Sequence, residues 1–288
     1  MDEQTALGLV GDRLAAAGDD CAVVDGQVIT TDMLHERTDF PDGTTRYTAG
    51  WRAVGASLSD VAAMGAEATA AVAVYAAPTF DESELSAFLD GATAVCEAVG
   101  AEYVGGDLDG HDEFTVATTA LGETDDPVRR SGAEPGDALC VTGTLGRTAA
   151  SIRLFDRGEV EAANELFRFE PRVAAGLALA PYASAMLDSS DGLARSVHQL
   201  AGASGCGAAL TEPLPVDERV DAVAEDAGDR RELGLFFGED FELVCTVPES
   251  DLAAARDATP CPLHRVGSVI EAGVTLDGEP LPDRGYSH

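Results

Sequence analysis

The residues best suited to chemistry begin in segment 18–40 of this sequence, where acidic side chains surround a predicted turn. Two β-prone runs, 21–24 and 27–31, flank Asp25-Gly26. This dipeptide tolerates the left-handed backbone that a two-residue hairpin turn requires. The segment therefore predicts a β-hairpin whose far end carries carboxylates.

The predicted register places Asp20 opposite Thr31 and Asp19 opposite Asp32. Facing carboxylates repel each other and weaken a hairpin, whereas a bound cation would reverse the sign of that interaction. A hairpin with a solvated polar end is the alternative. Other acidic residues recur beside turns or at element ends downstream: Asp60, Asp107, Asp109, Asp188, Asp191, Glu239 and Asp240. Mg²⁺ prefers oxygen ligands and takes one or two carboxylates together with phosphate oxygens, so the set indicates several Mg²⁺ ions around a polyphosphate.

Composition limits the classes of partner. The formal net charge is −34, every basic side chain is Arg, and the sequence contains no Lys. The electrostatic field of such a negative charge repels nucleic acid and anionic membranes, and ATP could bind only with the help of metal ions or clustered Arg side chains. The absence of Lys excludes a P-loop lysine, a protein-kinase strand lysine and Schiff-base chemistry.

The same composition bears on the environment. Many carboxylates without Lys are expected of a protein that stays soluble in concentrated salt. Six cysteines without a Cys-x-x-Cys spacing indicate reduced, buried thiols rather than metal or redox use. No signal peptide or apolar run of membrane-spanning length is visible, so we expect a cytoplasmic protein.

Helical and β-prone stretches alternate, which predicts an α/β fold. Segment 123–136 is rich in charge, Pro and Gly and predicts a boundary between domains 1–124 and 125–288. Helices are predicted at 49–63, 81–99, after 146, at 171–179 and at 193–202. Strands are predicted at 69–75, 102–104, 114–121, 138–142, 185–187, 208–211, 242–247, 265–269 and 274–276.

Three short motifs combine a turn with polar groups. Gly105-Gly106-Asp107 reads as a turn that lets backbone approach a ligand. In segment 188–192, Ser190 or Asp191 could cap the following helix, and a capped N-terminus can also bind phosphate. Segment 143–147 resembles a phosphate turn, with an ordinary strand-to-helix turn as the alternative. The doublet Arg129-Arg130 could bind phosphate through its guanidinium groups, with a solvated loop as the alternative.

Eight motifs together resemble thiamine-monophosphate kinases. They occur in the family's order and span nearly the whole chain: GDDCAV (18–23), TTDML (30–34), SLSDVAAMGA (57–66), GGD (105–107), RSGAEPGD (130–137), VTGTLG (141–146), LDSSDGL (187–193) and GEDFEL (238–243). The resemblance implies the fold of aminoimidazole ribonucleotide synthetase. That fold has an N-terminal α/β domain that dimerises and a C-terminal α-β-α domain.

The resemblance also implies a set of site residues. Positions matching Mg²⁺ ligands are Asp20, Thr30, Thr31, Asp32, Asp60, Asp107, Asp188 and Asp191. The positions that match the family's ATP contacts are Gly106, Asp107, Arg130 and Ser190. Those that match its substrate contacts are Asp39, Glu239 and Tyr286. Asp39 stands where the family commonly has His, and Arg52 replaces its usual Lys.

The implied reaction is ATP plus thiamine monophosphate giving ADP and thiamine diphosphate. Its acceptor is a phosphate oxygen that is already ionised, so no general base is needed. Catalysis then requires only that the reacting groups are positioned and their negative charge is neutralised. The expected catalytic residues are Asp32, Asp107 and Asp191. Another ATP-using enzyme of the same fold is an alternative, although a selenophosphate synthetase would need a reactive Cys that Cys21 does not provide. A non-catalytic Mg²⁺-nucleotide binding protein is a further alternative.

Overall fold

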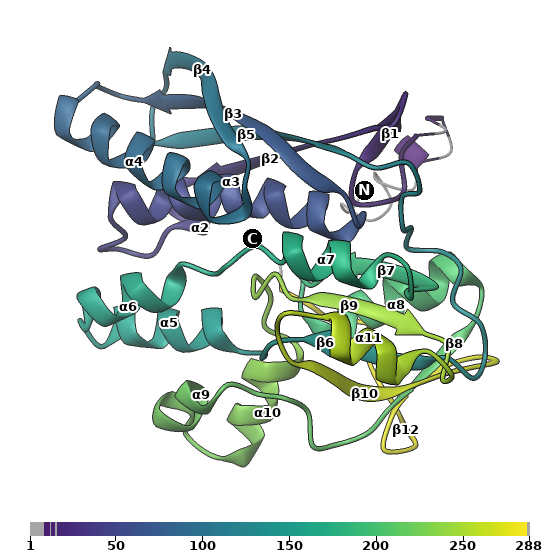
Figure 1. Cartoon of the computed structure of the whole chain (residues 1–288). Coiled ribbons are helices and arrows are strands. Elements are labelled where there is room, and N and C mark those ends of the chain that lie inside the picture. Colours follow the sequence, from purple (N-terminus) through teal and green to yellow (C-terminus); the bar gives the residue numbers. More distant parts are fainter. Residues whose placement is uncertain (1–8, 12, 15, 287–288) are drawn as a thin grey trace.

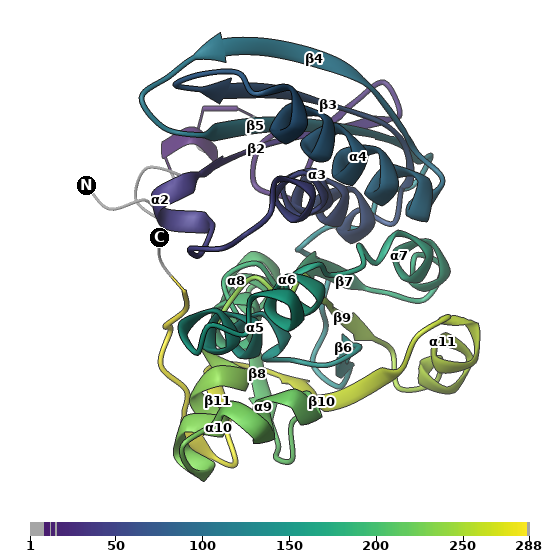
Figure 2. The same ribbon diagram turned by 90° about the vertical axis from the view of Figure 1, so that its left-hand side faces the viewer.

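The chain folds into two sheet-containing halves that pack closely against each other (Figures 1 and 2). This computed structural model describes residues 9–11, 13–14 and 16–286. Helices α3 and α4 lie between the first sheet and the second half, and the opposite face of that sheet carries no helix among the described residues. None of the helices described in these ranges is long and apolar enough to cross a membrane.

The first half contains a five-stranded sheet in the order β1-β2-β5-β3-β4. Its predicted hairpin is confirmed, with Val24 paired to Gln27 and Val23 to Val28. The described elements are β1 (Ala22–Val24), β2 (Gln27–His35), α2 (Glu36–Asp39), α3 (Arg46–Ala63), β3 (Glu67–Ala77), α4 (Glu82–Val99), β4 (Glu102–Gly110) and β5 (Thr115–Glu123).

The predicted continuation of the hairpin past Ala22 is wrong. The ladder ends at the pair Ala22 and Ile29, and the preceding residues turn toward the second half. There the carboxylate of Asp19 accepts hydrogen bonds from Arg129, and that of Asp20 from Arg130. Charge-assisted bonds to Arg thus replace the repulsive pair Asp19–Asp32 that the predicted register implied, and also bind Asp20.

Helix α4 begins and ends as its sequence predicts, and α3 ends as predicted at Ala63 but begins three residues earlier than the predicted start at 49. Thr45 and Asp81 accept hydrogen bonds from backbone N–H groups of the first turns of α3 and α4, and Gly100 ends α4 in the left-handed conformation. Close approach of the helices requires two glycines, because a Cβ at Gly50 or Gly91 would lie 2.2 or 2.0 Å from a carbonyl oxygen of the other helix. This contact packs α3, which carries several site residues, closely against α4.

The motif Gly105-Gly106-Asp107 lies inside strand β4, so its prediction as a turn is wrong. It pairs in parallel with Val72, Ala73 and Val74 of β3. A Cβ at position 106 would lie 1.7 Å from the carbonyl oxygen of Ala73. The second glycine is therefore explained by a close approach between strands, and the pairing extends β4 through the predicted turn.

The second half contains a seven-stranded sheet in the order β12-β11-β8-β10-β6-β9-β7. Its strands are β6 (Ala138–Thr142), β7 (Ala185–Asp188), β8 (Gly207–Leu210), β9 (Leu243–Val247), β10 (Leu263–Ile270), β11 (Val274–Leu276) and β12 (Glu279–Pro280). Its helices are α5 (Arg147–Asp156), α6 (Val160–Phe167), α7 (Val173–Leu179), α8 (Leu193–Ser204), α9 (Glu218–Val223), α10 (Ala227–Leu235) and α11 (Leu252–Ala258). The predicted strands are confirmed to within a few residues.

One apolar core runs through both halves. Leu58 and Met64 of the first half and Leu179 and Met186 of the second are fully buried in the same cluster. Helix α7 packs directly on α3, since a Cβ at Gly176 would lie 2.1 Å from the carbonyl oxygen of Ala62. This contact fixes the end of β7 beside the first half. All six cysteines are free thiols, and four of them are buried.

Candidate active site

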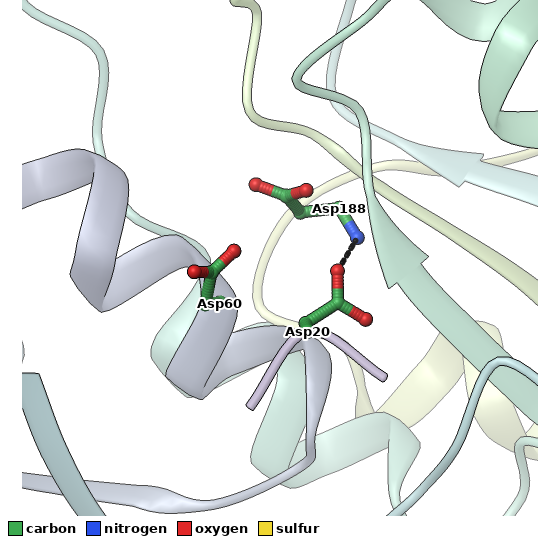
Figure 3. Close-up of side chains that lie close together, drawn as sticks. All are labelled: Asp20, Asp60 and Asp188. Atoms are coloured by element: carbon green, nitrogen blue, oxygen red, sulfur yellow. Dashed lines mark hydrogen bonds between the residues drawn. The ribbon is translucent and has the colours of Figure 1, made fainter. Parts of the chain in front are cut away.

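Three aspartates from distant parts of the chain meet between the halves (Figure 3). Asp20 precedes β1, Asp60 lies on α3, and Asp188 ends β7. Each offers one carboxylate oxygen, and these oxygens all lie within 4.8 Å of one another. We call this group the aspartate triad. Both halves contribute to it, so the packing of α3 against β7 decides its geometry.

Few cations or donors balance the triad. Arg130 donates to Asp20 from Nε (3.2 Å) and Nη2 (2.9 Å), and Thr30 Oγ1 donates to Asp60 at 2.5 Å. The backbone N–H of Asp188 donates to Asp20 at 3.5 Å. Oδ2 of Asp188 is buried and has no hydrogen-bond partner. A buried carboxylate oxygen without a partner is costly, and a cation would satisfy it.

The electrostatics agree with that geometry. Burial, and then the charge of Asp20, raises the pKa of Asp188 to about 8. Burial, followed by the charges of Asp32 and Asp188, raises the pKa of Asp60 well above its usual range. Burial also raises the pKa of Asp32, against the lowering effect of a hydrogen bond from Ser57. Each shift records the cost of placing negative charge here without a cation.

Strand β2 presents its residues to both faces of the first sheet. Thr30 and Asp32 face α3, where Thr30 contacts Asp60 and Asp32 accepts a hydrogen bond from Ser57 at 2.6 Å. Thr31 lies between them in the sequence, is exposed, and donates to the carbonyl oxygen of Thr118 at 2.8 Å. Because neighbouring side chains of a strand alternate between faces, Thr31 points away from the triad.

Asp107 and Gly106 do not join the triad within this chain. Strands β5 and β3 separate β2 from β4, so Asp32, Thr118, Ala73 and Gly106 form one row across the sheet. Three strand spacings amount to about 14 Å. Gly106 and Asp107 instead line a pocket of about 220 Å³ between β4 and α4, together with Ala73, Tyr75, Leu85, Phe88, Leu89, Tyr103, Gly105 and Leu108.

A second pocket contains all three predicted substrate contacts. Its volume is about 320 Å³, and Asp39, Glu239 and Tyr286 line it, with segment 37–42 and α5 forming its walls. The buried carboxylate of Asp39 accepts hydrogen bonds from the backbone N–H of His35 (2.6 Å) and from Thr38 Oγ1 (2.8 Å). We call this the thiamine pocket, after the ligand that the sequence predicts.

The loop 188–192 connects the triad to the thiamine pocket. Its first residue belongs to the triad, the carbonyl oxygen of Ser190 accepts a bond from Glu239 N (2.5 Å), and that of Asp191 accepts one from Tyr286 N (3.0 Å). Helix α8 has Gly192 at its N-cap, rather than Ser190 or Asp191. The loop therefore holds the two sites in a fixed relation.

Comparisons with known proteins identify the family of this chain. Residues 18–124 match the family model of AIR synthase related protein, N-terminal domain, and residues 134–277 match that of the C-terminal domain. A thiamine-monophosphate kinase of Halobacterium salinarum is 61% identical over 100% of both chains. One of Methanospirillum hungatei is 41% identical over 100% of this chain and 99% of its own. The chain belongs to the thiamine-monophosphate kinase family.

Solved structures of this family share the whole fold. The structure of AaThiL complexed with AMPPCP and TMP superposes with a TM-score of 0.90 at 29% identity, covering 99% of this chain and 96% of that chain. A thiamine-monophosphate kinase from Stenotrophomonas maltophilia gives 0.82 at 30% identity, covering 96% and 94%. The predicted two-domain fold is thus confirmed.

The structure of this family member also gives contacts for Ser57, which the sequence did not single out, and for Asp240, which the sequence placed only among the recurring acidic residues. Ser57 binds Asp32, and Asp240 accepts hydrogen bonds from the backbone N–H groups of Gly146 (2.5 Å) and Thr148 (2.9 Å) at the start of α5. Asp240 thus occupies the donors that a phosphate would need, which favours the ordinary-turn reading of segment 143–147. Glu239 and Asp240 are adjacent in the sequence, and this adjacency could have indicated that the two carboxylates have different contacts: Glu239 with Arg52, and Asp240 with the start of α5.

Proposed function

We propose that this protein transfers the γ-phosphoryl group of ATP to thiamine monophosphate, giving ADP and thiamine diphosphate. The observation that carries the proposal is the loop 188–192, which joins the aspartate triad to the thiamine pocket. A phosphate-binding centre and a pocket for the organic end of the acceptor would then lie side by side. The AMPPCP and TMP in the related AaThiL structure support the same pairing of substrates.

The residues of the triad fit magnesium ions. Its oxygens converge, Asp188 has an unpartnered buried oxygen, and Arg130 is the single cation bonded to Asp20 there among the described residues. We assign the ions to Asp20, Asp60 and Asp188, with Thr30 and Asp32 beside them, and extend the assignment to Asp191. Asp107 could join only from a second copy of the chain, and Thr31 is not included because its side chain points away from the triad. Bound Mg²⁺ would offset the charge of the phosphates and hold them in place.

The protein's own contribution is alignment. The acceptor phosphate oxygen needs no base, so the chain must hold it in line with the γ-phosphorus and the leaving oxygen. Glu239 and Tyr286 would fix the thiamine end, and Asp39 would line the pocket where the family commonly has His. Arg130 and Ser190 would meet the phosphates of ATP, whereas Gly106 and Asp107 could do so only from a second copy of the chain, because they lie about 14 Å from Asp32 within one chain. Asp32, Asp107 and Asp191 remain the proposed catalytic residues.

We further propose a homodimer formed through the first domain, residues 1–124, with 125–288 completing each site. The open face of the first sheet exposes Met33 and Val74, which a second copy could bury. Because Asp107 lies about 14 Å from Asp32 in one chain, it could assist an ion only in its partner's site. A two-fold dimer would supply this contact twice.

Mixed dimers test this arrangement. The inactive variants D32N and D107N are mixed and allowed to exchange subunits. If Asp107 acts across the interface, each mixed dimer has one intact site, so about a quarter of wild-type activity returns. No recovery, with subunit exchange verified by a tag, would show that the two residues act within one chain.

The kinase itself is tested by direct product analysis. Purified protein in molar KCl with Mg²⁺ and ATP is given thiamine monophosphate or free thiamine, beside a D191N control. We expect thiamine diphosphate from the monophosphate alone and loss of product in the control. ATP binding without phosphorylation of thiamine monophosphate would contradict the proposal and favour a non-catalytic nucleotide-binding protein.

We place the enzyme in a cytoplasm rich in salt. The net charge of −34 without any Lys supports this, because counter-ions screen repulsion among surface carboxylates. Its Tm should therefore rise between dilute buffer and molar KCl. An unchanged Tm would contradict adaptation to salt.

A further inference from the structure

Arg52 of α3 is fully buried at the junction of the two halves. Its Nη2 lies 2.8 Å from Oε2 of Glu239, which is 187 residues further along the chain. Burying an ion pair is expensive in desolvation, so such a pair contributes little to stability beyond what apolar residues could provide. Its presence beside the thiamine pocket calls for another explanation.

The surroundings of Arg52 use both terminal nitrogens of its guanidinium group, whereas Nε is buried and has no hydrogen-bond partner. Nη1 donates to the carbonyl oxygen of Phe167 at 2.7 Å, and Nη2 also donates to the carbonyl oxygen of Glu239 at 3.1 Å. Thr148 Oγ1 lies 3.4 Å from Nη2. The group stacks over the ring of Phe167, 3.7 Å from its centroid. A planar fork can make these contacts together, whereas a Lys ammonium is a single point.

Glu239 has a strained backbone that these contacts hold in place. Its φ is +63°, a conformation that costs energy for a residue with a side chain. Its N–H donates to Ser190, while its carbonyl oxygen accepts bonds from Arg52 and from Thr148 Oγ1 (2.6 Å). Both ends of the residue are thereby fixed, and its carboxylate is fixed at the pocket wall.

We infer that Arg52 is a positioning residue, which acts through Glu239 to set the thiamine pocket at the correct distance from the loop 188–192. It holds a carboxylate oxygen and the carbonyl oxygen of Glu239 from the first half, while Ser190 holds the N–H from the second. The inference rests on the proposed function, because the distance matters only if an acceptor in the pocket must reach a phosphoryl group at the triad.

The loss of Arg52 should therefore affect turnover more than fold. Without it, the carboxylate of Glu239 would be buried without its cation and would move toward the pocket or solvent. The acceptor phosphate would then shift relative to ATP, and a misplacement of about 1 Å costs roughly 100-fold in rate. ATP binding should change little, because none of the contacts of Arg52 reaches the loop residue Ser190 directly.

A double-mutant cycle tests the inference. R52M, E239Q and the double variant are compared with wild type for kcat and KM toward each substrate, and for Tm. We expect R52M to lower kcat/KM for thiamine monophosphate by about 10- to 100-fold and to leave KM for ATP within about threefold. When E239Q is already present, adding R52M should lower kcat/KM for thiamine monophosphate by less than about threefold, because the effect of Arg52 passes through Glu239. R52K should recover part of the loss.

Arg172 supplies a matched control. It forms a partly buried two-bond pair with Glu242 (2.7 and 2.8 Å), on the same segment as Glu239 but outside the thiamine pocket. R172M should lower Tm as R52M does, yet keep kcat/KM for thiamine monophosphate within about threefold of wild type. If R52M does not fold, the cycle is run with R52K.

Three results would overturn the inference: independent, multiplicative losses from R52M and E239Q, an equal kinetic loss in R172M, or an R52M defect explained entirely by unfolded protein. Wild-type turnover is measured first. A wild type that does not phosphorylate thiamine monophosphate contradicts the proposed function and this inference with it, whereas additivity in an active enzyme contradicts the inference alone.

Discussion

Replacing Asp188 by Asn should make the metal-free protein more stable at pH 8 while removing its activity. The buried carboxyl of Asp188 has a pKa of about 8, against an ordinary value of 3.8. The folded state therefore favours its protonated form. The stability that this group contributes is complete below pH 3.8 and is lost as the pH rises to about 8.

The size of the effect follows from the shift. At 1.36 kcal/mol per pKa unit, a shift of about 4 units corresponds to about 5 kcal/mol lost by pH 8. The variant cannot ionise at position 188, so its free energy of unfolding should exceed that of wild type by up to about this amount at pH 8, and the difference should shrink toward pH 4. Relaxation of the other triad carboxylates makes this an upper bound.

Urea unfolding in EDTA at pH 5 and pH 8, in molar KCl, measures the difference. Adding Mg²⁺ should stabilise wild type strongly at pH 8, because binding an ion to ionised carboxylates favours the folded state. The variant should gain much less. A D188N protein that is less stable than wild type in EDTA at pH 8 would refute the account of the triad as a repulsive cluster awaiting a cation.

Three other variants probe the site and its scaffold. D32N should lower kcat roughly 100- to 1,000-fold with Tm within a few degrees, since it removes charge beside the triad and keeps the hydrogen-bond geometry; near-wild-type turnover would exclude the role. Y286A should raise KM for thiamine monophosphate and leave KM for ATP unchanged, and equal changes in both would place Tyr286 elsewhere. G106A should lower Tm and activity together, because its Cβ would lie 1.7 Å from the carbonyl oxygen of Ala73; an unaltered Tm would contradict the close strand contact.

Local patterns predicted the elements well. The Asp25-Gly26 turn set the hairpin register because a two-residue turn leaves one pairing, and the caps of α4 marked both of its ends. Helix α6 (Val160–Phe167) was not predicted, although Ala163, Leu166 and Phe167 form its buried side. Its eight residues give too short a periodic pattern to stand out from the surrounding helical sequence.

Long-range contacts could not be predicted from local patterns. Asp20 leaves the hairpin because Arg130, 110 residues away, binds it, and no spacing rule relates those positions. Gly106 reads as a turn residue in isolation, but its neighbour in space is Ala73. The family resemblance named the triad positions but not their arrangement in space. It identified Arg52 only as a replacement for Lys, because the partners of Arg52 lie 115 and 187 residues further along the chain.

The division of the triad between the two halves constrains how this enzyme could change through evolution. The stretch 18–124 carries Asp20 and Asp60, while Asp188 belongs to the stretch 134–277. Neither stretch alone can assemble the three oxygens, so a shuffled gene that paired one half with a foreign partner would lose the ion site even if both halves folded. Natural selection must therefore act on the two as a single unit, and the contact of α3 with α7 and β7 is inherited with the chemistry.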